Sequence, residues 1–129
     1  MDWVVEVEVL PKRDGIALAR SCQRFAGGSA ANVAVGLARL GCRVGFVGQL
    51  GDDENGDFLR RAFQQKGVDT RGIVKIPGYE TPICWVAVDG RGDHIIIALP
   101  RDVETYGSGN LDLGRLATAQ GLYVGPSHT

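Results

Sequence analysis

The sequence predicts an α/β protein with a parallel, doubly wound sheet and a second, smaller antiparallel β layer. Two observations predict this class. In the middle of the chain, segments of helical and of strand periodicity alternate, as in a parallel sheet whose strands are joined by helices. At both flanks, apolar and polar residues alternate, which is typical of antiparallel strands with one face toward solvent or ligand. A separate β layer beside an α/β body is the arrangement of a lid.

The composition excludes several classes of protein. A chain of 129 residues with 44% hydrophobic and 22% charged residues is typical of one soluble globular domain. The formal charge of −1 comes from mixed signs, so we expect no nucleic-acid partner. No apolar run approaches the ~18 residues of a membrane span, and the charged first residues do not resemble a signal peptide. The three cysteines show no paired spacing, which favours a reducing compartment and predicts a cytoplasmic protein.

The first flank predicts two lid strands within about residues 3–20. The segment "WVVEVEVLP", from Trp3 to Pro11, alternates with a period of two and predicts a strand with one wet face. Asp14-Gly15 predicts a turn, and the residues that follow predict a short second strand.

The segment "GGSAANVAVGLARLG" predicts a helix from Ala30 to Leu40, ended by Gly41. Its start consists of small residues and one carboxamide, and two interpretations compete. Gly27 and Gly28 form a tight turn while Asn32 bonds locally, or the glycines admit a polar ligand that Asn32 binds. Because glycine has no Cβ and an amide both donates and accepts, the second arrangement suits vicinal hydroxyls. The pattern alone favours the tight turn, since short glycine-rich turns are frequent.

The centre of the chain predicts the α/β body, at about residues 27–76 and 111–126. The run 42–51 predicts a buried strand, and Glu54 to Lys66 predicts a helix that is capped by Asp52 or Asp53 and ended by Gly67. Residues 68–76 predict irregular chain and a further strand.

The second flank predicts a lid hairpin over about residues 81–99, turning at Asp89–Asp93. A polar loop at 101–110, a short helix at 111–120 and a last buried strand in "GLYVGPSHT" follow.

The acidic stretch "GDDENGD" has two interpretations, a metal site or the cap of the following helix. Its spacing does not fit a calcium loop, and carboxylates at a helix start are favoured by the helix dipole. Capping is therefore preferred and no metal site is predicted. His94 is expected on an exposed hairpin, and Trp3 and Trp85 are expected to be packing residues.

The stretch "GGSAANVAVGLARLGCRVGFVGQLGDDENG" resembles the N-terminal signature of the PfkB/ribokinase family of carbohydrate and nucleoside kinases. Asp2 nine residues before Pro11, "KGVDT" and the "TP…VDGRGD" hairpin extend the resemblance in order over the chain. The resemblance implies a ribokinase-like, Rossmann-like sheet that binds ATP and a β lid over a sugar-like substrate.

The resemblance also implies a set of substrate-binding residues. Asp2 matches an aspartate that accepts hydrogen bonds from substrate hydroxyls. The helix start holds the other side of the substrate, with one position that varies with substrate type. Two apolar positions of the lid, which match the family pattern less closely, face the substrate. The implied residues are Asp2, Gly27, Gly28, Ser29 (the variable position), Asn32, Cys84 and Val86.

The family's catalytic Gly-Ala-Gly-Asp motif does not occur in this sequence. The chain also begins just before Asp2, where the family places a core strand, and family members are more than twice as long. It therefore resembles an incomplete N-terminal portion, expected to be inactive alone, of a kinase that uses ATP and Mg²⁺. "LPRDVETYGSGN" replaces the family's Gly-Ala-Asn, so sugar and nucleoside both stay open as substrates. The alternative is a non-catalytic sugar-binding or dimerisation module, with a homodimer formed through the lid.

Overall fold

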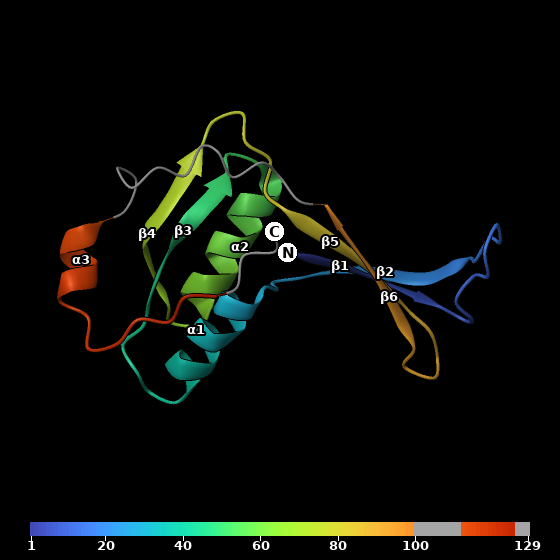
Figure 1. Cartoon of the computed structure of the whole chain (residues 1–129), viewed down its shortest axis with the longest axis horizontal. Helices are drawn as coiled ribbons and strands as arrows, with labels where there is room; N and C mark the ends of the chain where they lie inside the picture. Colours follow the sequence, from blue (N-terminus) through green and yellow to red (C-terminus); the bar gives the residue numbers. More distant parts are fainter. Residues whose placement is uncertain (100–111, 126–129) are drawn as a thin grey trace. The chain divides into compact units, whose positions relative to one another are not determined.

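The computed structural model describes residues 1–99 and 112–125 of the chain. The chain divides into two units. Unit 1 comprises Met1–Ala26 and Pro82–Pro100, and unit 2 comprises Gly27–Thr81 and Arg101–Thr129. Each unit has a sheet of its own (Figure 1). The chain thus leaves unit 1 at Ala26 and re-enters it at Pro82.

Unit 1 is a four-stranded sheet with the order β2-β1-β5-β6. Its strands are β1 (Asp2–Val7), β2 (Ala19–Phe25), β5 (Ile83–Val88) and β6 (His94–Leu99). The pairs β1/β2 and β5/β6 are antiparallel, whereas β1 and β5 are parallel. The layer that was expected to be antiparallel is therefore mixed, with one parallel pair between its two hairpins. The segment Gly27–Thr81 of unit 2 lies between the two hairpins in sequence, and a long crossover of this kind permits parallel pairing.

The second strand lies later in the chain than the sequence predicts. The turn at Asp14-Gly15 is present, with Gly15 N–H bonded to the carbonyl of Lys12 at 2.9 Å and Asp14 at a φ of 60°. The residues that follow the turn are not a strand, and Ile16 is 92% exposed. The strand begins only at Ala19 and runs to Phe25, because pairing with β1 decides its position.

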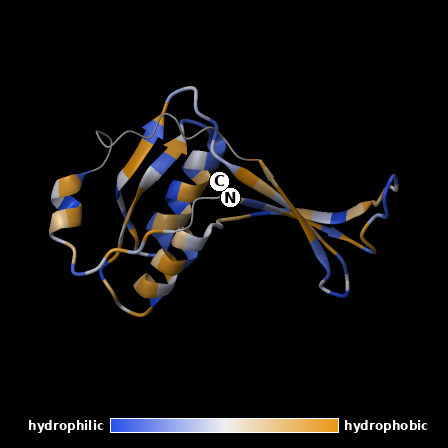
Figure 2. Cartoon of the chain, viewed as in Figure 1, coloured by the Kyte–Doolittle hydropathy of each residue, from blue (hydrophilic) through white to orange (hydrophobic). Residues whose placement is uncertain are grey.

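The register divides the side chains of this sheet between two faces. We call them the Asp2 face and the Trp3 face. On the Trp3 face, the rings of Trp3 and Trp85 stack at 5.6 Å, and the guanidinium of Arg24 lies 5.5 Å from the Trp3 ring centroid. Figure 2 shows apolar colours along most of β6. The Asp2 face carries Asp2, Val4, Glu6, Ser21, Gln23, Phe25, Cys84, Val86, Val88, His94, Ile96 and Ala98; the Trp3 face carries Trp3, Val5, Cys22, Arg24, Trp85, Ala87, Ile95 and Ile97.

Unit 2 contains the parallel strands β3 (Gly45–Gly51) and β4 (Asp69–Ile76). Helix α1 (Ser29–Arg39) packs on β3, and α2 (Glu54–Gln65) packs on both strands (Figure 1). Apolar side chains from all four elements form its core. The buried apolar residues are Ala31, Ala34, Leu50, Leu59, Phe63, Val68 and Ile73.

The two central helices begin and end near their predicted positions. Asp53 caps α2, since its carboxylate accepts from the amide of Gly56 at 2.7 Å. Phe63 of α2 stacks on Phe46 of β3 with ring centroids 4.6 Å apart. Gly67 follows α2 with a φ of 77°, a conformation that glycine adopts without strain. Periodicity and end signals therefore agree with the observed fold in this part of the chain.

The C-terminal part differs from its prediction. Helix α3 is short (Leu113–Ala117), and Arg115 joins it to β4 by an ion pair with Asp69 at 3.0 Å. The predicted last buried strand is wrong, because residues 121–125 form no strand and Val124 is 77% exposed. An apolar run becomes a strand only beside a partner, and no segment in the described ranges pairs with this one. The predicted loop at 101–110 lies outside the described residues.

Of the helices that the structure describes, none has the length and apolar character needed to cross a membrane.

Candidate substrate site

Three of the predicted site residues lie together on the Asp2 face of unit 1. Asp2 on β1 pairs with Cys84 on β5, and it pairs with Phe25 of β2 on its other side. Val86 pairs with Val4 one pleat further along the same face. The alternation of β1 and β5 thus brings one carboxylate together with several apolar side chains.

The carboxylate of Asp2 is partly exposed, and it has no hydrogen-bond or ion-pair partner among residues 1–99 and 112–125. An ionised carboxylate offers about four acceptor positions and no donor. With Cys84, Phe25 and Val86 around it, it presents strong acceptors within apolar surroundings. This combination suits a molecule that has hydroxyl groups on a partly apolar ring.

A second group of predicted residues lies at the start of α1 in unit 2. Gly28 is the N-cap, with a φ of 108°, and no side chain caps the helix. The amide of Asn32 bonds to the carbonyl of Gly28 at 2.9 Å and is the first of the intrahelical series. The preceding amides of α1 therefore keep N–H groups that a ligand can use. The positive φ accounts for glycine at this position.

Asn32 does not make the local hydrogen bond of the tight-turn interpretation. Its side chain is exposed, and its carboxamide has no partner in the part of the chain that the structure describes. Ser29, beside it, is exposed as well, and Gly27 is partly exposed. Donor and acceptor groups at this helix start are therefore open.

The two groups belong to different units of the chain. Asp2, Cys84 and Val86 lie in unit 1, whereas Gly27 to Asn32 lie in unit 2. The sequence did not indicate that Gly125 approaches the start of α1, where a Cβ on Gly125 would lie 2.9 Å from the Cβ of Ala30. Ser127, which the family resemblance places near another substrate-side position, is outside the described residues.

The acidic stretch at the start of α2 forms ion pairs and a cap. Lys75 of β4 contacts Asp52 at 2.9 Å and Asp57 at 2.7 Å. Its hydrogen bond lowers the pKa of Asp57, and the two carboxylates raise the pKa of Lys75. In the ranges that the structure describes, no three His, Cys, Asp or Glu residues are grouped as metal ligands. The capping interpretation of this stretch is confirmed by Asp53.

Sequence reasoning missed a connection between Asp53 and Thr81. Thr81 is 3% exposed, and both its amide and its hydroxyl donate to the Asp53 carboxylate, at 2.8 and 2.7 Å. The motifs "GDDENG" and "TP" contain the two residues, but nothing in the pattern joined them across 28 positions.

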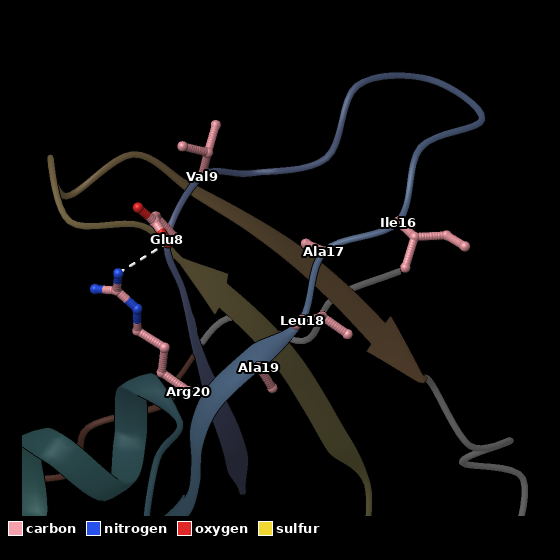
Figure 3. A pocket seen from close by; sticks show the side chains of 7 residues that line it. All are labelled: Glu8, Val9, Ile16, Ala17, Leu18, Ala19 and Arg20. Atoms are coloured by element: carbon pink, nitrogen blue, oxygen red, sulfur yellow. Dashed lines mark ion pairs between the residues drawn. The ribbon is translucent and has the colours of Figure 1, made fainter.

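An open hollow of about 440 Å³ lies at the loop between β1 and β2 (Figure 3). Exposed apolar residues such as Ile16 and Leu18 line it, and an ion pair between Glu8 and Arg20 at 3.0 Å borders it. None of the predicted site residues lines this hollow. The candidate site therefore rests on the Asp2 face and the α1 start.

These features define an α/β protein with an attached β sheet and with open polar groups suited to a polyhydroxylated ligand. Residues 1–125 match the model of the pfkB family carbohydrate kinases, and the chain belongs to this family.

Relatives and solved structures agree with this family. The chain is 34% identical over 123 residues to the ATP-dependent ribose-1-phosphate kinase of Halopiger xanaduensis, covering 95% of this chain and 42% of that enzyme. The crystal structure of fructokinase from Xylella fastidiosa matches with a TM-score of 0.71 and 32% identity, over 91% of this chain and 37% of that one. The structure of Arabidopsis thaliana ribokinase complexed with ribose and ATP matches with a TM-score of 0.66 and 32% identity. The match covers 76% of this chain and 32% of that one.

The chain thus spans about two fifths of the length of such relatives. The ribokinase-like fold expected from the sequence is confirmed by the solved structures.

Proposed function

We propose that this chain is the substrate-binding part of an ATP-dependent sugar kinase, which transfers the γ-phosphate of ATP to a carbohydrate hydroxyl. One observation carries the proposal. The family resemblance assigns the side chains of Asp2 and Asn32 to the substrate. In the described residues, neither side chain has a hydrogen-bond or ion-pair partner. Both side chains are therefore free to hydrogen-bond to a substrate.

Each residue has a distinct task in this proposal. Asp2 accepts hydrogen bonds from sugar hydroxyls, and Asn32 both donates and accepts. Gly27 and Gly28 leave room for the sugar beside the free amides of α1, and Ser29 adjusts the fit to the substrate. Cys84 and Val86 pack on the apolar side of the ring. Together these contacts orient the attacking hydroxyl, and orientation alone lowers the barrier of a group transfer.

ATP supplies the phosphoryl group, and Mg²⁺ neutralises its charge. In residues 1–99 and 112–125, the carboxylates near α2 are engaged by Lys75, Gly56 and Thr81 and do not form a magnesium site. We therefore assign ATP and Mg²⁺ to other parts of the intact protein and expect the isolated chain to be inactive. The cytoplasm remains the expected compartment.

The charges of the Asp2 face favour a neutral sugar over a sugar phosphate. This face carries the carboxylates of Asp2 and Glu6 and no lysine or arginine. A phosphate group beside these two carboxylates would be repelled, and among the described residues no lysine or arginine on this face offsets the repulsion. A nucleoside is the alternative substrate within the same family, because its ribose offers the same vicinal hydroxyls.

The test measures ADP release by the intact protein with ATP and, separately, ribose, fructose, ribose 1-phosphate and adenosine. We expect turnover with a free sugar, and no turnover with any carbohydrate or nucleoside would contradict the proposal. Binding of a sugar by calorimetry without turnover would instead identify a non-catalytic sugar-binding module.

We further propose that a second copy of the protein covers the Trp3 face. This face carries large apolar side chains that are well exposed, among them Trp85, Ile95 and Ile97. It is the face opposite Asp2, so a partner there leaves the substrate residues free. Exposed apolar surface of this kind is typical of an interface.

A further inference from the structure

The end of the first segment of unit 2, Gly27–Thr81, is held by a compact set of hydrogen bonds. Asp53 Oδ1 accepts from the amide of Gly56 at 2.7 Å and from the hydroxyl of Thr81 at 2.7 Å. Asp53 Oδ2 accepts from the amide of Thr81 at 2.8 Å. The Thr81 hydroxyl in turn accepts from the amide of Gly51 at 3.0 Å. The end of β3, the start of α2 and Thr81 are thereby joined through one carboxylate.

This set of contacts leaves no room for additional atoms. A Cβ on Gly51 would overlap the backbone of Tyr79 and Thr81, and a Cβ on Gly56 would overlap the carbonyl of Gly51. Close packing of this kind restricts Thr81 to one position. Thr81 is the last residue of the first segment of unit 2, and only Pro82 separates it from β5, which carries Cys84 and Val86.

We propose that Asp53 is a positioning residue, which through Thr81 fixes the point at which the chain leaves unit 2 and continues into β5, and so fixes Cys84 and Val86 for sugar binding. The inference rests on the proposed function, because it assigns these two residues to the sugar. Asp53 itself does not touch the substrate.

A helix cap alone does not account for an aspartate here. Asparagine and serine cap helices as well as aspartate does. The second oxygen of Asp53 is used by the Thr81 amide, which needs an acceptor that asparagine replaces with a donor. Burial alone would raise the pKa of Asp53, but hydrogen bonds from Thr81 and Gly56, together with Lys75, outweigh it and lower the pKa. The ionised carboxylate is thus the form that holds Thr81.

The experiment compares Asp53→Asn with Asp52→Asn in the intact protein. Asp53→Asn removes one negative charge. It keeps the cap of α2 but breaks the hydrogen bond to the Thr81 amide. Asp52→Asn makes the same charge change at the neighbouring residue and breaks only a contact with Lys75. A second pair, Thr81→Val and Thr81→Ser, removes or keeps the hydroxyl that bonds to both Asp53 and Gly51.

Two readouts are taken, hydrogen–deuterium exchange of peptides and steady-state kinetics. For Asp53→Asn and Thr81→Val we expect exchange at residues 81–88 to rise about tenfold, with the helix α2 unchanged, as for a lost buried hydrogen bond. We expect the KM for the sugar to rise by about the same factor, while the KM for ATP changes less than about twofold. Asp52→Asn and Thr81→Ser should behave like the parent protein.

Faster exchange in the first turn of α2 without a change at 81–88 would show that Asp53 only caps the helix. Faster exchange at 81–88 with an unchanged sugar KM would likewise overturn the inference. If the parent protein itself shows no sugar-dependent turnover, the proposed function fails, and the exchange data still decide whether Asp53 holds β5.

Discussion

Asn32 is the residue at which a binding role and a structural role predict different outcomes. An aspartate in the first turn of α1 is compatible with the helix and is favoured by its dipole. Asn32→Asp should therefore leave the melting temperature nearly unchanged. It removes the donors of the carboxamide and adds a charge, so we expect sugar binding to weaken by ~1–3 kcal/mol. The measurement is the KM for sugar and for ATP in the intact enzyme.

Asn32→Ser is the matched control, because it keeps one donor and acceptor without charge. It should weaken sugar binding less than Asn32→Asp does. An unchanged sugar KM in a folded Asn32→Asp protein would restore a structural role for Asn32.

At the residue scale, the candidate site residues came from the family resemblance and not from a local pattern. The resemblance implied Asp2, Cys84 and Val86, and the register of β1 and β5 puts these three on one face. It also implied Gly28, which the structure places at the N-cap of α1. The link between Asp53 and Thr81 could not be predicted, because it joins residues far apart in sequence that only the packing of α2 on the sheet brings together.

At the element scale, Asp69 joins the start of β4 to α3. Its carboxylate accepts from the side chain and the amide of Arg71 and from Arg115, and these bonds hold its pKa well below the usual range. A lowered pKa means that this stabilisation is present above about pH 4, the ordinary value for aspartate, and is lost as pH falls through the folded value.

We therefore expect Asp69→Asn to destabilise the protein at pH 7 by no more than about 1 kcal/mol, since Arg71 is largely exposed and Arg115 is partly exposed. The difference from the parent should shrink as the pH is lowered below about 4. Urea unfolding at a series of pH values, followed by circular dichroism, measures it. A difference that grows toward acid pH would contradict the assigned role.

Elements with a strong internal pattern were predicted well, and elements defined by their neighbours were not. Periodicity and caps placed α1 and α2 within a residue or two. The strand β2 was misplaced because its position depends on pairing with β1. The parallel pairing of β1 with β5 and the absence of a strand at 121–125 depend on contacts between distant segments, which a local pattern does not contain.

At the scale of the whole molecule, two adjacent residues of β6 allow the proposed interface and the proposed substrate face to be tested separately, because one residue lies on each face. Ile97 is 60% exposed on the Trp3 face, and Ile96 is 57% exposed on the Asp2 face. We expect Ile97→Glu to convert a dimer to a monomer, because it places a charge in an apolar interface. Ile96→Glu should leave the dimer intact and raise the sugar KM.

Light scattering over a concentration series and sugar kinetics test both variants. A parent protein that is monomeric at all concentrations would exclude the dimer. Dissociation by Ile96→Glu alone would assign the interface to the wrong face.

The parallel pairing of β1 with β5 also sets an order in which the chain can fold during synthesis. The first hairpin leaves the ribosome early, but its partner strand follows only after α1, β3, α2 and β4 have been made. At ordinary rates of translation the hairpin waits for several seconds with Trp3 and Val5 uncovered. Two-stranded hairpins are marginal in water, so the segment Gly27–Thr81 of unit 2 is able to collapse before the sheet of unit 1 exists. The sheet of unit 1 is therefore completed only after β5 and β6 have been made.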